Sequence, residues 1–112
     1  MGVNYRAMIF VGKHFDSAHE AEDFLRDNIG FTDEEEREIE EDGLQEFLCC
    51  VNRFSLDGEV INCYSDYGFL LGTELGVSQP EMFGKHYSEA VEHWNKMFPE
   101  HPAQLIREVK VY

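Results

Sequence analysis

The chain has 112 residues, of which 43% are hydrophobic, and a formal net charge of −14 from 23 acidic and 9 basic residues. Nine Phe, five Tyr and one Trp supply apolar material for one ordinary domain, which argues against a disordered chain. This excess of negative charge argues against direct binding to nucleic acid or to an anionic membrane. We therefore expect a single compact domain over residues 1–112, located in the cytoplasm.

Three cysteines, Cys49, Cys50 and Cys63, show no C-x-x-C spacing. Neither a zinc site nor a redox motif is indicated, and reduced, mostly buried thiols are the expectation for a cytosolic protein. We expect no cofactor and no metal.

The first strand and the first helix are predicted from the alternation of apolar residues and from a helix-capping pattern. Residues 3–11 alternate and are rich in β-formers, which predicts a strand with apolar side chains on both faces. Ser17 and Glu20 have capping-box spacing, which predicts a helix over residues 18–28 that Gly30 ends.

A second capping box starts an acidic helix. Thr32 and Glu35 have the spacing, and the helix is predicted to run from Asp33 to an interruption at Gly43. Residues 43–54 have both helical spacing and the composition of a strand. We favour a short helix there and keep a strand as the alternative.

The second half of the chain contains further strands and one long helix. Residues 60–64 and 67–75 read as two strands joined by a tight turn, and residues 105–112 as the last strand. A third capping box, Ser78 with Glu81, predicts a helix over residues 79–98. Its apolar stripe is formed by Phe83, Tyr87, Ala90, Val91, Trp94 and Phe98.

This order of elements indicates an α+β fold. A strand, helices, two strands, a helix and a strand match the βαββαβ order of a ferredoxin-like domain. We expect a four-stranded antiparallel sheet with the helices packed on one face, and a fifth strand if residues 43–54 are extended.

Nearly all of the excess charge lies in one block. Residues 16–46 carry fourteen acids and two bases, and residues 33–42 alone carry eight acids. Ten helical residues span about 15 Å, so this helix bears about one carboxylate per 2 Å, close to the one phosphate per roughly 1.7 Å of duplex DNA. Its last three acids lie where the helix dipole disfavours anions, which is mild evidence for a role outside folding.

Two interpretations of the acidic block stay open: a solvated face that keeps the protein soluble, and a surface that binds a basic partner. Calcium is a poorer interpretation, because no D-x-D-x-D-G loop is present and a helix spreads its carboxylates outward. The residues predicted to bind a basic partner are Asp33, Glu34, Glu36, Glu40, Glu41, Asp42, Glu22 and Asp23.

The histidines and glycines give no catalytic or metal site. His86 and His93 are two helical turns, about 10 Å, apart, which is too far for one zinc ion, so we expect polar residues that border the apolar stripe. Gly68, Gly72 and Gly76 do not form a phosphate-binding loop and are predicted to let strands approach closely. No residue has an activating base at a readable distance, and no catalytic residue is predicted.

The sheet face away from the helices supplies the alternative hypothesis. In a ferredoxin-like domain this face is open, and apolar residues there indicate an interface. The residues predicted to lie on it are Met8, Phe10, Tyr64, Leu70 and Tyr112.

Two functional hypotheses follow. The first is a non-catalytic interaction protein that binds a basic surface of a nucleic-acid-binding protein as a charge mimic or inhibitor, by analogy with acidic anti-defence inhibitors. The second is a symmetric homodimer or larger homo-oligomer with a ligand-binding or regulatory role, joined through the open sheet face.

Overall fold

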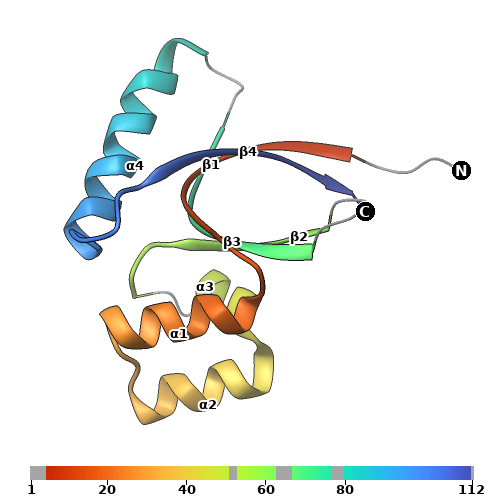
Figure 1. The fold of residues 1–112 in the computed structure, drawn as a ribbon, viewed down its shortest axis with the longest axis vertical. Helices are drawn as coiled ribbons and strands as arrows, with labels where there is room; N and C mark the ends of the chain where they lie inside the picture. Colours follow the sequence, from red (N-terminus) through yellow and green to blue (C-terminus); the bar gives the residue numbers. More distant parts are fainter. Residues whose placement is uncertain (1–4, 51–52, 63–66, 77–79, 112) are drawn as a thin grey trace, which may run out of the picture.

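The computed structural model describes residues 5–50, 53–62, 67–76 and 80–111 (Figure 1). The elements are, in chain order, β1 (Tyr5–Phe15), α1 (Ala18–Asn28), α2 (Asp33–Asp42), α3 (Leu44–Cys50), β2 (Asp57–Asn62), β3 (Tyr67–Leu75), the 3-10 helix η1 (Pro80–Met82), α4 (Phe83–Met97) and β4 (Gln104–Val111). The helix expected over residues 79–98 is therefore η1 followed by α4.

The fold is α+β, with four α-helices and a four-stranded antiparallel sheet of strand order β2-β3-β1-β4 among the described residues. The expected βαββαβ order is wrong in its first connection, which contains three helices and makes the order βαααββαβ. Gly43 ends α2 with a φ of 86°, and the chain then re-enters a helix at Leu44. Residues 44–50 are thus helical, as favoured, and no fifth strand forms in the described part of the chain.

Two of the three expected capping boxes lie within the described residues. The Thr32 side chain accepts from the Glu35 amide at 3.1 Å, and the Glu35 carboxylate accepts from the Thr32 amide at 2.9 Å, so this box is complete. Ser17 accepts from the Glu20 amide, but the Glu20 carboxylate accepts from the Asp16 amide instead of that of Ser17. Ser78 lies outside the described residues.

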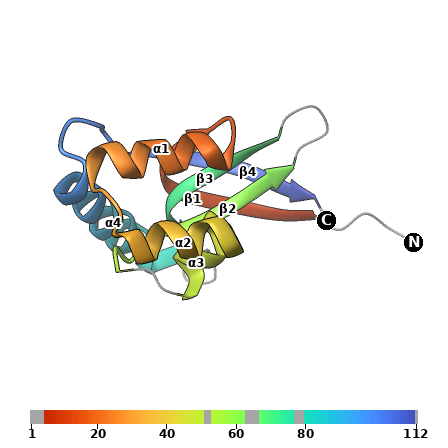
Figure 2. The ribbon, with the colours of Figure 1, turned by 90° about the horizontal axis from the view of Figure 1, so that it is seen from below.

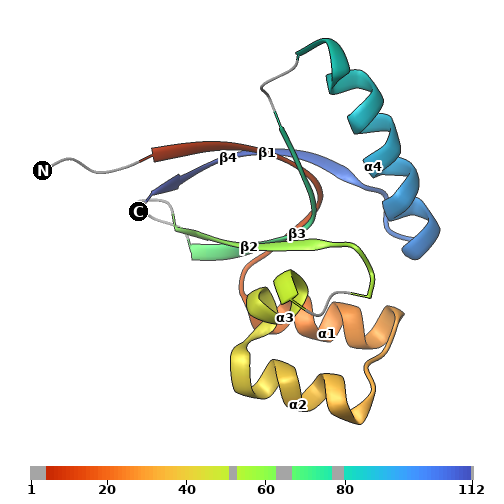
Figure 3. The same ribbon diagram turned by 180° about the vertical axis from the view of Figure 1, so that it is seen from behind.

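The sheet is bent at a pair of facing glycines. Gly12 of β1 lies opposite Gly72 of β3, and a Cβ atom on either would collide with the backbone of the other strand, at the carbonyl of Leu71 or of Val11. Only glycine permits this approach. Figures 1 and 3 show the result, a curved sheet in which β1 and β3 run through the bend, with β4 in one arm and β2 in the other. The expected role of Gly72 is confirmed.

All four α-helices pack outside this curve, which confirms the expectation that the helices cover one face (Figures 1 and 2). The largest core cluster joins α1, α2 and α3 to β3 through residues such as Leu25, Ile39 and Leu71. Trp94 at the C-terminal part of α4 belongs to the same cluster, whereas Ala90 packs with Val11 and Leu75 in a second one. The apolar stripe of α4 is therefore the surface that attaches it to the sheet.

The opposite, concave face is closed by the curvature itself. Met8, Phe10, Ile61 and Leu70 form a buried cluster there, against which Ile106 packs, and the two edge strands β2 and β4 contact each other. The expectation of an open apolar face is wrong for Met8, Phe10 and Leu70, which are at most 2% exposed. The physical reason is the bend, which folds the two arms towards one another.

The other two residues predicted for that face, Tyr64 and Tyr112, lie outside the described residues. Among those described, Leu105 is the large hydrophobic residue that is exposed. The homo-oligomer hypothesis therefore loses Met8, Phe10 and Leu70 as interface residues.

Candidate functional site

Helix α2 sorts its acids into an inward and an outward group. Glu35 and Ile39 face the core and are buried, and the Thr32 cap fixes the start of the helix and hence its rotation. Five of its acids are exposed and form no ion pair with another described residue. We call them the displayed acids: Asp33, Glu34, Glu40, Glu41 and Asp42.

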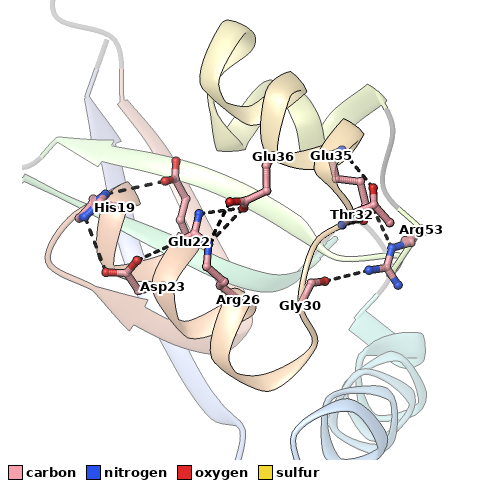
Figure 4. Close-up of polar contacts among 9 residues, drawn as sticks. All are labelled: His19, Glu22, Asp23, Arg26, Gly30, Thr32, Glu35, Glu36 and Arg53. Carbon is pink, nitrogen blue, oxygen red and sulfur yellow. Dashed lines mark hydrogen bonds and ion pairs between the residues drawn. The ribbon is translucent and has the colours of Figure 1, made fainter.

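Arg53 binds the inward acid. Its Nε donates to Oε2 of Glu35 at 2.7 Å, and its Nη2 donates to the carbonyl of Gly30 at 2.9 Å (Figure 4). The guanidinium also lies over the ring of Phe54, 4.1 Å from its centroid. The hydrogen bond from Arg53 is the main reason why the pKa of Glu35 is lowered from its usual value. The Glu35 carboxylate is therefore charged and helps to hold the fold together.

Arg26 links α1 to α2. Its Nη1 donates to Oδ1 of Asp23 at 2.8 Å within α1, and its Nη2 donates to Oε1 of Glu36 on α2 at 2.9 Å (Figure 4). The hydrogen bond to Glu36 is the main cause that raises the pKa of Arg26. Asp23 and Glu36, both predicted to bind a partner, are therefore already engaged by a base of the same chain.

Glu22, the eighth predicted residue, is the least available. Its side chain is 20% exposed, and burial raises its pKa, an effect that His19 and Arg26 oppose. The structure thus places five of the eight predicted residues on the surface without an ion pair to a described residue, and sets Glu22, Asp23 and Glu36 apart from them.

The end of α2 opens into an acidic hollow of about 490 Å³ between α3 and β2. Asp42 lines it together with Glu46 of α3 and three acids of the sheet, Asp57, Glu59 and Glu74. We call it the acidic hollow. Neighbouring carboxylates raise the negative potential of a concave surface. No sequence pattern indicated the three sheet acids, because only the tertiary fold brings β2 and β3 beside the end of α2.

A second hollow, of about 440 Å³, lies between α4, the end of β3 and the segment after α3. The hollow is lined from α4 by His86, Glu89 and His93, from β3 by Thr73, Glu74 and Leu75, and from the intervening segment by Ser55. We call it the histidine hollow. The two histidines do border the apolar stripe as expected, but Ser55 and Thr73 carry no motif that would have identified them.

The thiols differ from the expectation of burial. Cys49 and Cys50 are both exposed, and Cys63 lies outside the described residues. The Cys50 thiol donates to Oε1 of Glu46 at 3.3 Å, and this hydrogen bond is the main cause that raises the pKa of Cys50 to about 11. A thiol of that pKa stays protonated at neutral pH and is a weak nucleophile.

The described residues hold no group of three or more His, Cys, Asp or Glu side chains placed to bind a metal ion. Within the same part of the chain, every helix is too short or too polar to cross a lipid bilayer.

No protein-family model matches the chain, and neither does any curated protein or solved structure.

Proposed function

We propose that the protein is a non-catalytic interaction protein, whose displayed acids and acidic hollow together bind a basic surface of a nucleic-acid-binding protein and compete there with nucleic acid. The observation that carries this proposal is the C-terminal end of α2. Glu40, Glu41 and Asp42 are exposed at the helix end where the dipole disfavours anions, and no described base pairs with them.

The arrangement of charge sharpens the analogy with nucleic acid. The displayed acids form two groups on α2, at residues 33–34 and 40–42, about 11 Å apart along the helix axis. Five charges over about 15 Å average one per roughly 3 Å, which is near the density of one per about 3.4 Å along a single DNA strand. The charge density is therefore closer to that of one phosphate strand than to that of a duplex, because Arg53 and Arg26 engage Glu35 and Glu36 and Glu38 is half-buried.

The acidic hollow extends this surface beyond one helix. It begins at Asp42, and its other acids come from α3, β2 and β3. A partner with a row of Lys or Arg side chains would meet charge from α2 to the sheet edge. Such steering gives fast association that weakens steeply as salt rises.

The test is a pull-down from a lysate of the source organism, followed by competition with nucleic acid. The wild type is compared with the triple variant Glu40→Gln, Glu41→Gln, Asp42→Asn. The matched control changes three exposed acids on α4 and at its ends, Glu81→Gln, Glu92→Gln and Glu100→Gln, and so alters the net charge equally. We expect wild type and control to retain a basic protein at low salt that high salt or added DNA releases, and the α2 variant to lose it.

Equal retention by the α2 variant and the wild type would contradict the proposal. Retention that added DNA leaves unchanged would contradict the mimicry part of it.

A further inference from the structure

The histidine hollow has the chemistry of a site for a cationic group. Its polar lining contains the exposed Glu89 and the half-buried Glu74, which it shares with the acidic hollow, together with two imidazoles and the hydroxyls of Ser55 and Thr73. Among the described residues, no Lys or Arg lines it. At about 440 Å³ it falls within the range of about 300–1,000 Å³ usual for ligand pockets.

One ring nitrogen of His93 is engaged by the backbone, which sets the tautomer of the ring. Its Nε2 lies 2.9 Å from the carbonyl oxygen of Phe54. A carbonyl oxygen only accepts hydrogen bonds, so Nε2 carries the proton, and Nδ1 of the neutral ring is left as an acceptor. The same bond holds α4 against the segment that carries Ser55, so the two sides of the hollow are fixed relative to each other.

The walls of the hollow are partly apolar and attached to the core. Ser55 lies between Phe54 and Leu56, which are both buried, and Leu75 and Ala90 supply an apolar surface from the second core cluster. A fixed site of this kind suits a charged head group on an aliphatic stem, because the stem packs on the apolar wall while the head reaches the acceptors.

We propose that the histidine hollow binds the guanidinium group of an arginine side chain presented by the basic partner. This inference rests on the proposed function and names the side chain that anchors the partner. A guanidinium has five donors in a planar fork and suits acceptors spread around a wall, whereas an ammonium is a compact charge with three donors. An anion would be repelled by Glu89, and arginine is among the residues most often found as interface anchors.

The experiment follows backbone amide NMR shifts of ¹⁵N-labelled protein during titration with N-acetyl-arginine amide. The neutral isostere N-acetyl-citrulline amide is the charge control. We expect saturable shifts at Ser55, Thr73 and Glu89 with the arginine compound, and none with the citrulline compound. Shifts confined to α2, or equal shifts with citrulline, would overturn the inference.

A pair of variants tests the role of the carboxylate. Glu89→Gln and Glu92→Gln each remove one exposed charge from α4, but only Glu89 lines the hollow. We expect Glu89→Gln to weaken arginine binding about threefold to tenfold, as for an exposed charge-assisted hydrogen bond, and Glu92→Gln to leave it unchanged. Equal effects of the two variants would contradict a site in the hollow.

A capped Gly-Gly-Arg-Gly-Gly peptide separates a partner's side chain from a free metabolite. If the peptide binds at least as tightly as free arginine, the result supports a protein partner. If free arginine binds clearly more tightly, the claim that the arginine belongs to a protein partner is wrong. The triple α2 variant keeps the two proposals distinct: it should lose the partner but keep the arginine-induced shifts. If the arginine compound causes no shifts in the wild type while the wild type still retains the basic partner, the arginine site is refuted and the proposed function is not.

Discussion

On the inward face of α2, Glu35 is buried and bound by Arg53, whereas on the outward face Glu40 and Glu41 are exposed and meet no described base. Both faces belong to one ten-residue helix and carry the same kind of side chain. The difference shows that charge in this block has two roles. One part joins α1, α2, the loop between them and the segment after α3, and the other part is left for solvent or a partner. The five predictions below concern the free energy of unfolding, from the largest expected change to the smallest.

The apolar residue of the inward face should matter most. Ile39 is 5% exposed and belongs to the main core cluster. Ile39→Ala should lower the free energy of unfolding by about 2–5 kcal/mol, because it removes buried methyl groups and leaves a cavity. Urea denaturation monitored by circular dichroism measures this. The control Glu41→Ala, on the exposed face, should change it by less than about 0.5 kcal/mol. Similar losses in the two variants would refute the assignment of faces.

Glu35→Gln should come second, because glutamine preserves the capping box and removes only the charge. We expect a loss of about 1–2 kcal/mol at pH 7, at or below the lower end of the range for hydrogen bonds to charged groups, since the Arg53 side chain is 49% exposed. Glu34→Gln, an exposed neighbour with the same charge change, is the control. If both variants unfold at the same urea concentration, Glu35 has no structural role.

The Glu35–Arg53 ion pair should also make the free energy of unfolding depend on pH. The pKa of Glu35 is lower in the folded protein than in the unfolded chain. Its stabilising contribution is therefore present above the unfolded value of about 4.3 and is lost as the pH falls through the folded value. The difference in stability between wild type and Glu35→Gln should shrink on acidification through this range, and a constant difference would contradict the assignment.

Glu36→Gln should have a smaller effect, which depends on salt. The Glu36 and Arg26 side chains are 41% and 39% exposed, so water and ions screen their contact. We expect a loss of stability at low ionic strength that is smaller than that of Glu35→Gln and disappears in 1 M salt. Thermal unfolding at both salt concentrations measures it. A loss of stability that persists in high salt would mean that the Arg26–Glu36 pair supports the fold as the Arg53–Glu35 pair does.

The triple variant of Glu40, Glu41 and Asp42 should show the smallest change. Removing the three charges relieves repulsion and an adverse interaction with the helix dipole, so stability should stay within about 0.5 kcal/mol or rise slightly. Urea denaturation checks this directly. A clear loss of stability would mean that these acids support the fold, and their loss of partner binding would then carry no information.

Much of the local structure was predictable because its causes are local. The Thr32 and Glu35 box, the stop at Gly43 and the apolar stripe ending at Phe98 depend on spacing within a few residues. The length and type of the main elements follow from such signals. The candidate site was predictable to a similar extent, because the sequence indicated the acidic helix and all five displayed acids.

The features that the sequence did not predict depend on contacts between segments that are far apart in the chain. Arg53 meets Glu35 across eighteen positions, and Arg26 meets Glu36 across ten, so sequence alone did not separate structural from displayed acids. The cysteines were expected to be buried on composition, yet Cys49 and Cys50 lie on the exposed side of α3. Both hollows join three or more elements and have no sequence motif.

The charge of this protein, the starts of α1 and α2 and the α+β class could be derived without a structure, because they depend on composition and near neighbours. Tertiary structure alone decided the closed concave face and the division of the acids. Gly12 and Gly72 have no special meaning until the strands pair and place them opposite each other. At that point the lack of two Cβ atoms lets the sheet bend, and Met8, Phe10 and Leu70 pass from an expected interface to the interior.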